Sequence, residues 1–167
     1  IRSQSLEKSE LMINHIYAAN QSSFNLLETL LDWAKTQTQQ ISVRPVKLNL
    51  TQLIENCISE FETTSLNKNI KIEFNREDII TVLSDENMIN SILRNLISNS
   101  IKYSNIGGSI KISQNLNSGF VEVSFADEGI GIKEEIKSRL FSSNVNESGF
   151  GTSNEKGSGL GLVICKE

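Results

Sequence analysis

The chain has 167 residues, of which 38% are hydrophobic and 22% are charged, and its formal net charge is −4. These values are typical of a globular α+β domain with an ordinary core, and the mild acidity gives no electrostatic reason to expect nucleic acid as a partner. Cys57 and Cys165 lie far apart and outside any metal-ligand spacing, so the sequence suggests neither a disulfide framework nor a zinc site. No apolar run approaches the roughly 18 residues of a membrane span, and the first residues show no signal-peptide pattern.

A long amphipathic helix is predicted first, because residues 9–40 lack Gly and Pro and carry apolar or small side chains at three- and four-residue steps. At about 1.5 Å per residue this helix is roughly 45 Å long, so we expect it to meet another helix in a bundle or coiled coil. Packing within the chain's own core is the alternative. Pro45 disfavours helix around it and marks a domain boundary, with residues 1–45 as one region and 46–167 as the other.

Helical and strand patterns alternate after this boundary. Asn49 with Gln52 is typical of a capped helix start, and Ser84 or Asp85 precedes a second helical pattern. The spacing predicts, in chain order, a helix over 49–66, strands over 70–74 and 79–83, a helix over 86–103, strands over 110–113 and 120–125, a short helix over 133–141, a flexible loop over 142–157 and a last helix from Gly159.

The helix over 86–103 carries the first of four segments with candidate functional residues. At 100° per residue, Asn95, Asn99, Lys102 and Tyr103 fall within an arc of about 80° to 100°, opposite the apolar side. Asn costs roughly 0.5 kcal/mol or more against Ala in a helix. Two on one face therefore need compensation, which is either a chemical role or hydrogen bonds to neighbouring backbone.

The second segment is Asp127-Glu128-Gly129-Ile130-Gly131-Ile132. Asp127 ends an apolar strand, and the glycines indicate that the backbone passes close to another group. A carboxylate there can accept a hydrogen bond from the exocyclic amine of adenine, which guanine, with a carbonyl at that position, cannot donate. An ordinary turn is the alternative.

The third segment, Leu140-Phe141, precedes the polar loop, and Phe141 either fills the core or anchors that loop. The fourth is Lys156-Gly157-Ser158-Gly159-Leu160-Gly161-Leu162. Its glycines leave backbone N–H groups open to phosphate oxygens, and the start of the last helix adds a positive end. The spacing fits neither a dinucleotide fingerprint nor a Walker loop.

In this order the four segments resemble the N, G1, F and G2 boxes of sensor histidine kinases, within the ATPase superfamily that includes Hsp90, gyrase B and MutL. The resemblance extends from about Leu48 to the end, and the long helix before it resembles the second helix of these kinases' dimerisation hairpin. It implies an α+β fold: a two-layer α/β sandwich of the Bergerat type, with a mixed sheet covered on one face by helices.

The resemblance also implies a role for each residue in binding ATP and Mg²⁺. Asn99 would hold Mg²⁺, Lys102 would neutralise a phosphate, and Asn95 would face the γ-phosphate, which makes these three the catalytic set. Asp127 would select the base, and Phe141 would anchor the ATP lid. The implied nucleotide contacts are Asn95, Asn99, Lys102, Tyr103, Asp127, Gly129, Gly131, Ile132, Phe141, Lys156, Gly157, Ser158, Gly159, Leu160, Gly161 and Leu162. The lid departs from the commonest form, because Ser143-Asn144-Val145-Asn146 stands where a second aromatic is often found.

The implied activity is transfer of the γ-phosphoryl group of ATP to a histidine of the dimerisation domain and then to a response-regulator aspartate. His15, followed by Ile16-Tyr17-Ala18, does not match the acceptor context. We therefore expect the acceptor to lie outside this sequence, this fragment not to autophosphorylate, and the whole protein to be longer at both ends. The implied partners are a second copy, through the long helix, and a response-regulator receiver domain. The implied location is the cytoplasmic portion of a membrane-anchored bacterial sensor.

Two alternatives remain open at this stage. An ATP-hydrolysing relative would place a Glu one helical turn before the metal-binding Asn, where this chain has Asn95. A dimerisation or scaffold module with a decayed ATP site is disfavoured by the intact set of Asn99, Asp127 and the glycines.

Overall fold

The structure, a computed structural model, describes residues 43–76, 78–142, 149–155 and 159–166, together with five residues between 12 and 27. The chain divides into two compact units, Ile1–Ile41 and Ser42–Glu167. The five described residues of the first unit are helical. The rest of the predicted long helix, including His15, lies outside the described residues.

The second unit combines short strands with helices. Its described elements are β1 (Val46–Asn49), α2 (Leu50–Glu60), α3 (Glu62–Asn67), β2 (Lys71–Phe74), β3 (Thr81–Ser84), α4 (Glu86–Tyr103), β4 (Ser109–Asn117), β5 (Phe120–Asp127), α5 (Glu134–Lys137) and α6 (Gly161–Lys166). In the part of the chain that the structure describes, we find no helix that is both long and apolar enough to cross a membrane.

The strands form a mixed sheet and a separate two-stranded ladder. In the mixed sheet the order is β2-β4-β5, with β2 parallel to β4 and β4 antiparallel to β5. The ladder pairs β1 with β3 in antiparallel fashion. β4 and β5 are joined at Ser118 and Gly119, whose φ angles of 46° and 92° are the positive values that a tight type I′ hairpin turn requires.

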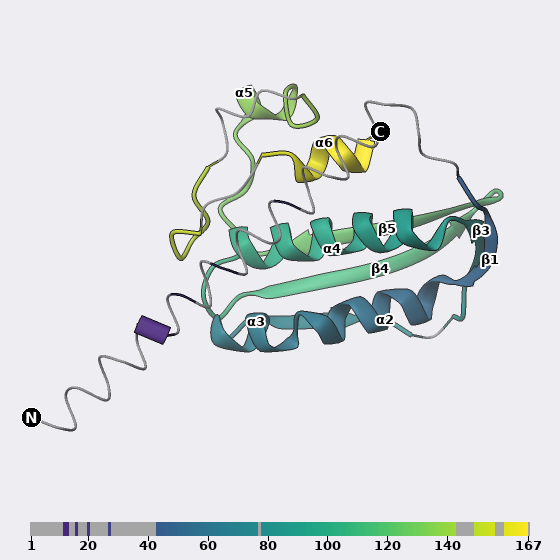
Figure 1. Cartoon of the computed structure of the whole chain (residues 1–167), viewed down its shortest axis with the longest axis horizontal. Helices are drawn as coiled ribbons and strands as arrows, with labels where there is room; N and C mark the ends of the chain where they lie inside the picture. The colour runs from purple at the N-terminus through teal and green to yellow at the C-terminus, as the bar shows by residue number, and fades with distance from the viewer. Residues whose placement is uncertain are drawn as a thin grey trace, which may run out of the picture. The chain divides into compact units, whose positions relative to one another are not determined.

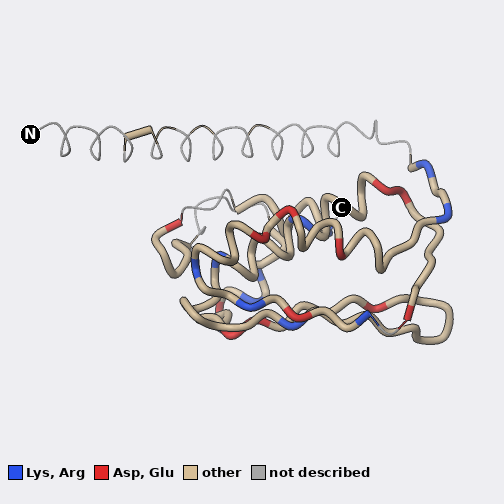
Figure 2. The backbone as a smooth tube through the Cα atoms, turned by 90° about the horizontal axis from the view of Figure 1, so that it is seen from below, with Lys and Arg blue, Asp and Glu red and all other residues tan. Residues whose placement is uncertain are grey.

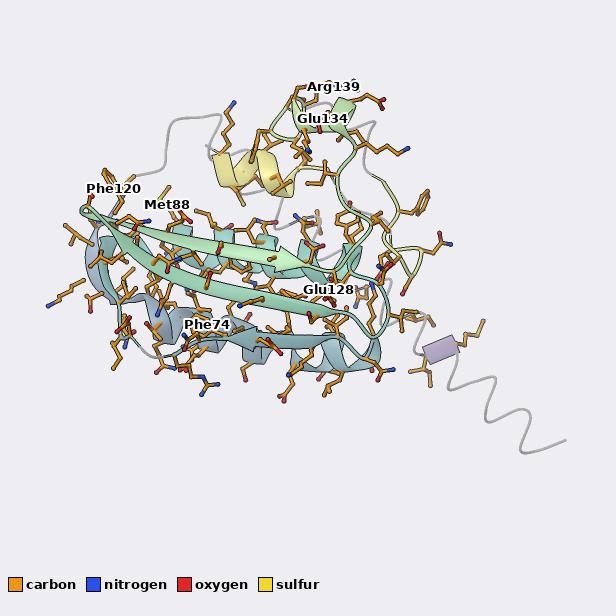
Figure 3. All side chains as sticks on the ribbon, turned by 180° about the vertical axis from the view of Figure 1, so that it is seen from behind. Phe74, Met88, Phe120, Glu128, Glu134 and Arg139 are labelled. Carbon is orange, nitrogen blue, oxygen red and sulfur yellow. The ribbon has the colours of Figure 1, made fainter. Side chains whose placement is uncertain are left out.

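Helices α2 and α4 lie over one face of the mixed sheet (Figure 1). Seen from behind, the strands lie in front of these helices (Figure 3), and the edge-on view separates the two layers (Figure 2). Between the layers lies the core, whose most deeply buried apolar residues include Ile54, Leu93, Ile97, Ile110 and Ile112, each at most 3% exposed. This is the two-layer α+β architecture that the family resemblance implied.

The central helix α4 has the bounds that were predicted. Asp85 caps it, because its carboxylate accepts hydrogen bonds from the backbone N–H groups of Asn87 (3.0 Å) and Met88 (3.3 Å). Its buried stripe faces the core and consists of Leu93, Ile97, Ser100 and Ile101. The polar face with Asn95, Asn99 and Lys102 is consequently left half-buried and open to other parts of the unit.

Several elements differ from the sequence prediction. The helix predicted over 133–141 is limited to α5 (Glu134–Lys137), and β4 continues to Asn117, four residues beyond its predicted end. The helix over 49–66 is interrupted at Phe61, whose ψ of 4° lies outside the helical range and separates α2 from α3. Strand β1 was not predicted, because it is short and its pairing partner β3 is distant in sequence. The last helix begins at Gly161 rather than Gly159, since Gly159 has a φ of 72°, which a right-handed helix cannot accommodate.

Candidate functional site

The predicted site residues gather around the C-terminal half of α4. Helix α6 packs against α4, and an isolated bridge pairs Ser104, just after α4, with Gly129, just after β5. Figure 3 places Glu128 at this end of β5, opposite Phe120 at the hairpin turn. The second and fourth predicted segments therefore both contact α4, the second at the C-terminal end of the helix and the fourth beside Asn95.

Asn95 lies where α4 meets α6. Its Nδ2 donates to the carbonyl oxygen of Ser91 at 3.0 Å. This is a hydrogen bond to neighbouring backbone, which the sequence left open as the alternative to a chemical role for this residue. Its Oδ1 faces Gly161, where an added Cβ would come within 2.5 Å of that oxygen. Glycine at 161 is therefore what allows α6 to approach α4 so closely.

Asn99 is half-buried one turn further along the same face of α4. Within the described residues, no group of three or more His, Cys, Asp or Glu side chains is placed to hold a metal ion. An amide oxygen is a hard ligand of the kind that Mg²⁺ accepts, alongside substrate phosphates and waters. The donor set here thus fits a metal that arrives with a phosphorylated ligand, and not a cage built by the protein alone.

Lys102 is held at the end of α4. Its Nζ donates to the hydroxyl of Tyr103 at 3.0 Å and to the carbonyl oxygen of Gly149 at 3.3 Å, and it lies 4.6 Å from the centre of the Tyr103 ring. All of these partners are neutral. An anionic ligand would therefore be a stronger partner for this ammonium than the groups that it contacts here.

Asp127 is the last residue of β5, as the sequence predicted, and it is exposed. Gly129 presses against the end of α4: an added Cβ would collide with the carbonyl oxygen of Tyr103 and come within 2.6 Å of Asp127 Oδ1. The N–H of Ile130 donates to that same Tyr103 carbonyl at 3.1 Å. The close approach of the two backbones brings Asp127 to the C-terminal end of α4, near Tyr103.

The remaining predicted residues of the second and third segments, Gly131, Ile132 and Phe141, are exposed. Gly131 has a φ of 66°, and Ile132 after it is 52% exposed. Phe141 is 49% exposed, which excludes the interpretation that it fills the core.

Only part of the fourth segment can be placed. Lys156, Gly157 and Ser158 lie outside the described residues, so the phosphate-facing turn stays a prediction. Leu160 is buried at 5% exposure, while Gly161 and Leu162, the first residues of α6, are half-buried.

Sequence reasoning missed a buried lysine behind the site. Lys68 is 7% exposed, and its Nζ lies 2.8 Å and 3.1 Å from the carbonyl oxygens of Ile101 and Lys102, 2.7 Å from Thr152 Oγ1 and 3.0 Å from Glu155 Oε1. In the sequence it stands in the polar turn Asn67-Lys68-Asn69, where a lysine is normally solvated. No local signal could have found it.

The segment 149–155 lies within the loop that was predicted to be flexible, and it is hydrogen-bonded to the end of α4. The N–H of Thr152 donates to the carbonyl oxygen of Lys102 at 3.0 Å, and an added Cβ at Gly151 would lie 2.6 Å from Lys102 Cγ. Partial burial would raise the pKa of Glu155, but hydrogen bonds from its own N–H, from Lys68 Nζ and from the N–H of Ser153 outweigh this effect and lower it.

A separate groove of about 640 Å³ lies away from these residues. It is lined by apolar side chains of β3, α4 and the β4–β5 hairpin, including Val82, Ile92, Leu96 and Val123. It contains none of the polar residues predicted for the nucleotide.

Comparison with known proteins identifies the class of protein to which this chain belongs. Residues 84–167, which contain all four segments, match the family described as histidine kinase-, DNA gyrase B-, and HSP90-like ATPase. The chain belongs to this family, as an ATP-binding domain of the sensor histidine kinase type.

Individual relatives agree with this assignment. The signal transduction histidine-protein kinase BaeS of Escherichia coli K12 is 28% identical over 140 residues, which are 84% of this chain and 30% of BaeS. The catalytic domain of histidine kinase ThkA is 31% identical with a TM-score of 0.65, covering 74% of this chain and 78% of that one. ThkA in complex with the response regulator TrrA is 29% identical with a TM-score of 0.66, covering 92% and 41%. The chain spans less than half the length of the first curated relatives it matches.

Proposed function

We propose that this chain is the catalytic portion of a histidine kinase, which transfers the γ-phosphoryl group of ATP to a histidine that lies outside this sequence, for relay to a response-regulator aspartate. The observation that carries the proposal is the junction at the end of α4. There the last turn of α4, at the end of the polar face with Asn95, Asn99 and Lys102, packs against Gly129, and the Tyr103 carbonyl accepts a hydrogen bond from the N–H of Ile130.

Base recognition is assigned to Asp127. An exposed carboxylate accepts hydrogen bonds only, so it pairs with the exocyclic amine of adenine and meets a carbonyl acceptor in guanine. Tyr103, next to the Gly129 contact, would lie along the nucleotide.

Phosphate recognition is assigned to Lys102, Asn95 and the backbone amides of the glycine segment over 156–162. Asn99 would hold Mg²⁺ through its amide oxygen. When bound, the ion offsets the negative charge of the phosphates. Lys102 would exchange a neutral partner for a phosphate oxygen, which is a stronger, charge-assisted hydrogen bond.

Transfer to a histidine is favoured over hydrolysis. Hydrolysis needs a general base to activate water, and Asn95 is an amide that cannot take a proton at neutral pH. A neutral imidazole is itself nucleophilic and needs no such base. The protein's contribution is then positioning and charge stabilisation.

We further propose the partners that such a kinase requires. The region 1–45 would pair with a second copy, and a receiver domain would take the phosphoryl group, by analogy with ThkA, which has been solved with its response regulator. The whole protein would be a membrane-anchored sensor with this portion in the cytoplasm.

Titration calorimetry tests the pocket. A non-hydrolysable ATP analogue should bind with Mg²⁺ assistance, and the GTP counterpart should not. Asp127→Asn should weaken binding roughly tenfold to a hundredfold, the range for losing a hydrogen bond to a charged group, and Asn99→Ala should remove the metal dependence.

Matched controls lie close by. Glu122→Gln changes an exposed carboxylate on β5 that lies outside the assigned site, and Ser98→Ala changes an exposed residue beside Asn99. Both should bind as the unaltered chain does. Equal binding of adenine and guanine nucleotides, or none at all, would contradict the proposal and leave the scaffold interpretation.

A further inference from the structure

The last turn of α4 is completed by groups from distant parts of the chain. The final four carbonyls of a helix lack partners within it. Here the N–H of Ser104 donates to Ser100 at 3.0 Å, while the carbonyl of Tyr103 is taken by the turn after β5. The two carbonyls between them, of Ile101 and Lys102, both lie within hydrogen-bonding distance of Lys68 Nζ.

Lys68 is stabilised in this buried position by charge as well as by hydrogen bonds. The C-terminal end of a helix carries a partial negative charge, which favours a cation. A full counter-charge comes from Glu155, whose Oε1 is 3.0 Å from Lys68 Nζ. A buried ammonium without such partners is strongly unfavourable. Removing Glu155 would therefore destabilise the fold, because Lys68 would stay buried without its counter-charge.

The same ammonium holds the segment 149–155. Thr152 Oγ1 accepts from Lys68 Nζ at 2.7 Å and donates to the carbonyl oxygen of Ser104 at 2.6 Å. Glu155 Oε2 in turn accepts from the N–H of Ser153 at 2.8 Å, which closes the segment on itself. Lys68 therefore joins three pieces of chain: the turn after α3, the end of α4 and the segment before the glycine turn.

We propose that Lys68 is a positioning residue for phosphate recognition. Lys68 fixes the segment 149–155 to the end of α4 and binds the backbone carbonyl of Lys102. It thereby keeps Gly149, whose carbonyl oxygen accepts from the Lys102 ammonium, close to that side chain. The role of Lys102 at the phosphates rests on the proposed function; the anchoring itself does not.

Amide hydrogen exchange of the full chain without nucleotide tests the anchoring. In Lys68→Met, exchange of the amides of Gly151 and Thr152 should accelerate about tenfold or more, the effect expected when hydrogen bonds to a charged group are lost. The amides of Ile112 and Phe125 in the sheet should stay protected. Lys71→Met is the matched control, since Lys71 is exposed and paired only with the nearby Glu73 among the residues described.

A second variant covers the case in which Lys68→Met does not fold. Thr152→Val keeps the shape of the side chain and removes the hydroxyl that links Lys68 to Ser104, so it should also accelerate exchange at 151 and 152. Protection of these two amides within twofold of the unaltered chain, in a variant whose sheet is folded, would overturn the anchoring.

Ligand affinity tests the consequence for the phosphates. Lys68→Met should weaken binding of a non-hydrolysable ATP analogue about tenfold, while the affinity for adenosine, which lacks phosphates, should change less than twofold. Equal weakening for both ligands would mean a general structural role and would overturn the positioning role. If the unaltered chain binds neither ligand, the proposed function fails, whereas the exchange result still decides whether Lys68 anchors the segment.

Discussion

At the scale of single residues, the glycines around α4 have a steric explanation. Gly129, Gly151 and Gly161 each stand where an added Cβ would meet an atom of α4 at 2.6 Å or less. The obstacle differs: at 129 and 151 it includes backbone of α4, whereas at 161 it is the end of the Asn95 side chain. Backbone cannot give way without moving the helix, so the consequences of substitution should differ too.

Gly129→Ala should be among the most damaging single substitutions at the site. Forcing a methyl group against the Tyr103 carbonyl should lower the free energy of unfolding by about 1–3 kcal/mol, as for overpacking elsewhere, and should displace Asp127. Urea denaturation and nucleotide titration measure the two effects. Gly149→Ala is the control, because an added Cβ there meets nothing within 4 Å and its φ is not positive. Equal stability of both variants would refute this account of Gly129.

Between elements, Gly161 and Asn95 set the distance from α6 to α4. Gly161→Ala should destabilise the unit, and Asn95→Ala in the same chain should recover most of the loss, because it removes the atom that the new methyl group meets. A double-mutant cycle by chemical denaturation gives the coupling. Additive effects, with no recovery, would mean that another contact limits the approach of α6.

The N-terminus of α4 gives a prediction about pH. The N–H of Arg44, at 2.9 Å, and those of Met88 and Asn87 lower the pKa of Asp85. A lowered folded-state pKa contributes stability that is present above the unfolded value of about 4 and is lost as the pH falls through the folded value. Asp85→Asn keeps a capping oxygen without the charge. Its stability should therefore fall less between pH 5 and pH 3 than that of the unaltered chain; equal slopes in urea denaturation would contradict this.

A structural feature could be predicted from the sequence when the residues that produce it are close together in the chain. Helix α4 has its predicted bounds because its cap and apolar stripe lie within its own residues, and the same periodicity put Asn95, Asn99 and Lys102 on one face. The approach of Asp127 to the end of α4 came from the family resemblance alone. Strand β1 and the Lys68 anchor were not predictable, because each needs a partner far away in sequence, 84 residues for Lys68 and Thr152.

For the whole molecule, the second unit contains everything that the proposed pocket needs. Its buried apolar residues come from 48–163, and the assigned nucleotide residues from 95–162. A fragment of residues 42–167 should therefore unfold cooperatively and bind the ATP analogue within about twofold of the full chain, since the contacts that the structure describes for the assigned residues lie within the second unit.

The same truncation separates catalysis from assembly. If residues 1–41 pair with a second copy, sedimentation should give a dimer for the full chain and a monomer for residues 42–167, because the helical stripe that would meet the other copy has been removed. Replacing Ile13 and Ile16 by Asp in the full chain is the matched test, since it changes that stripe without shortening the chain. A monomer at every concentration in the full chain, or a dimer that survives truncation, would show that the dimerisation surface lies elsewhere.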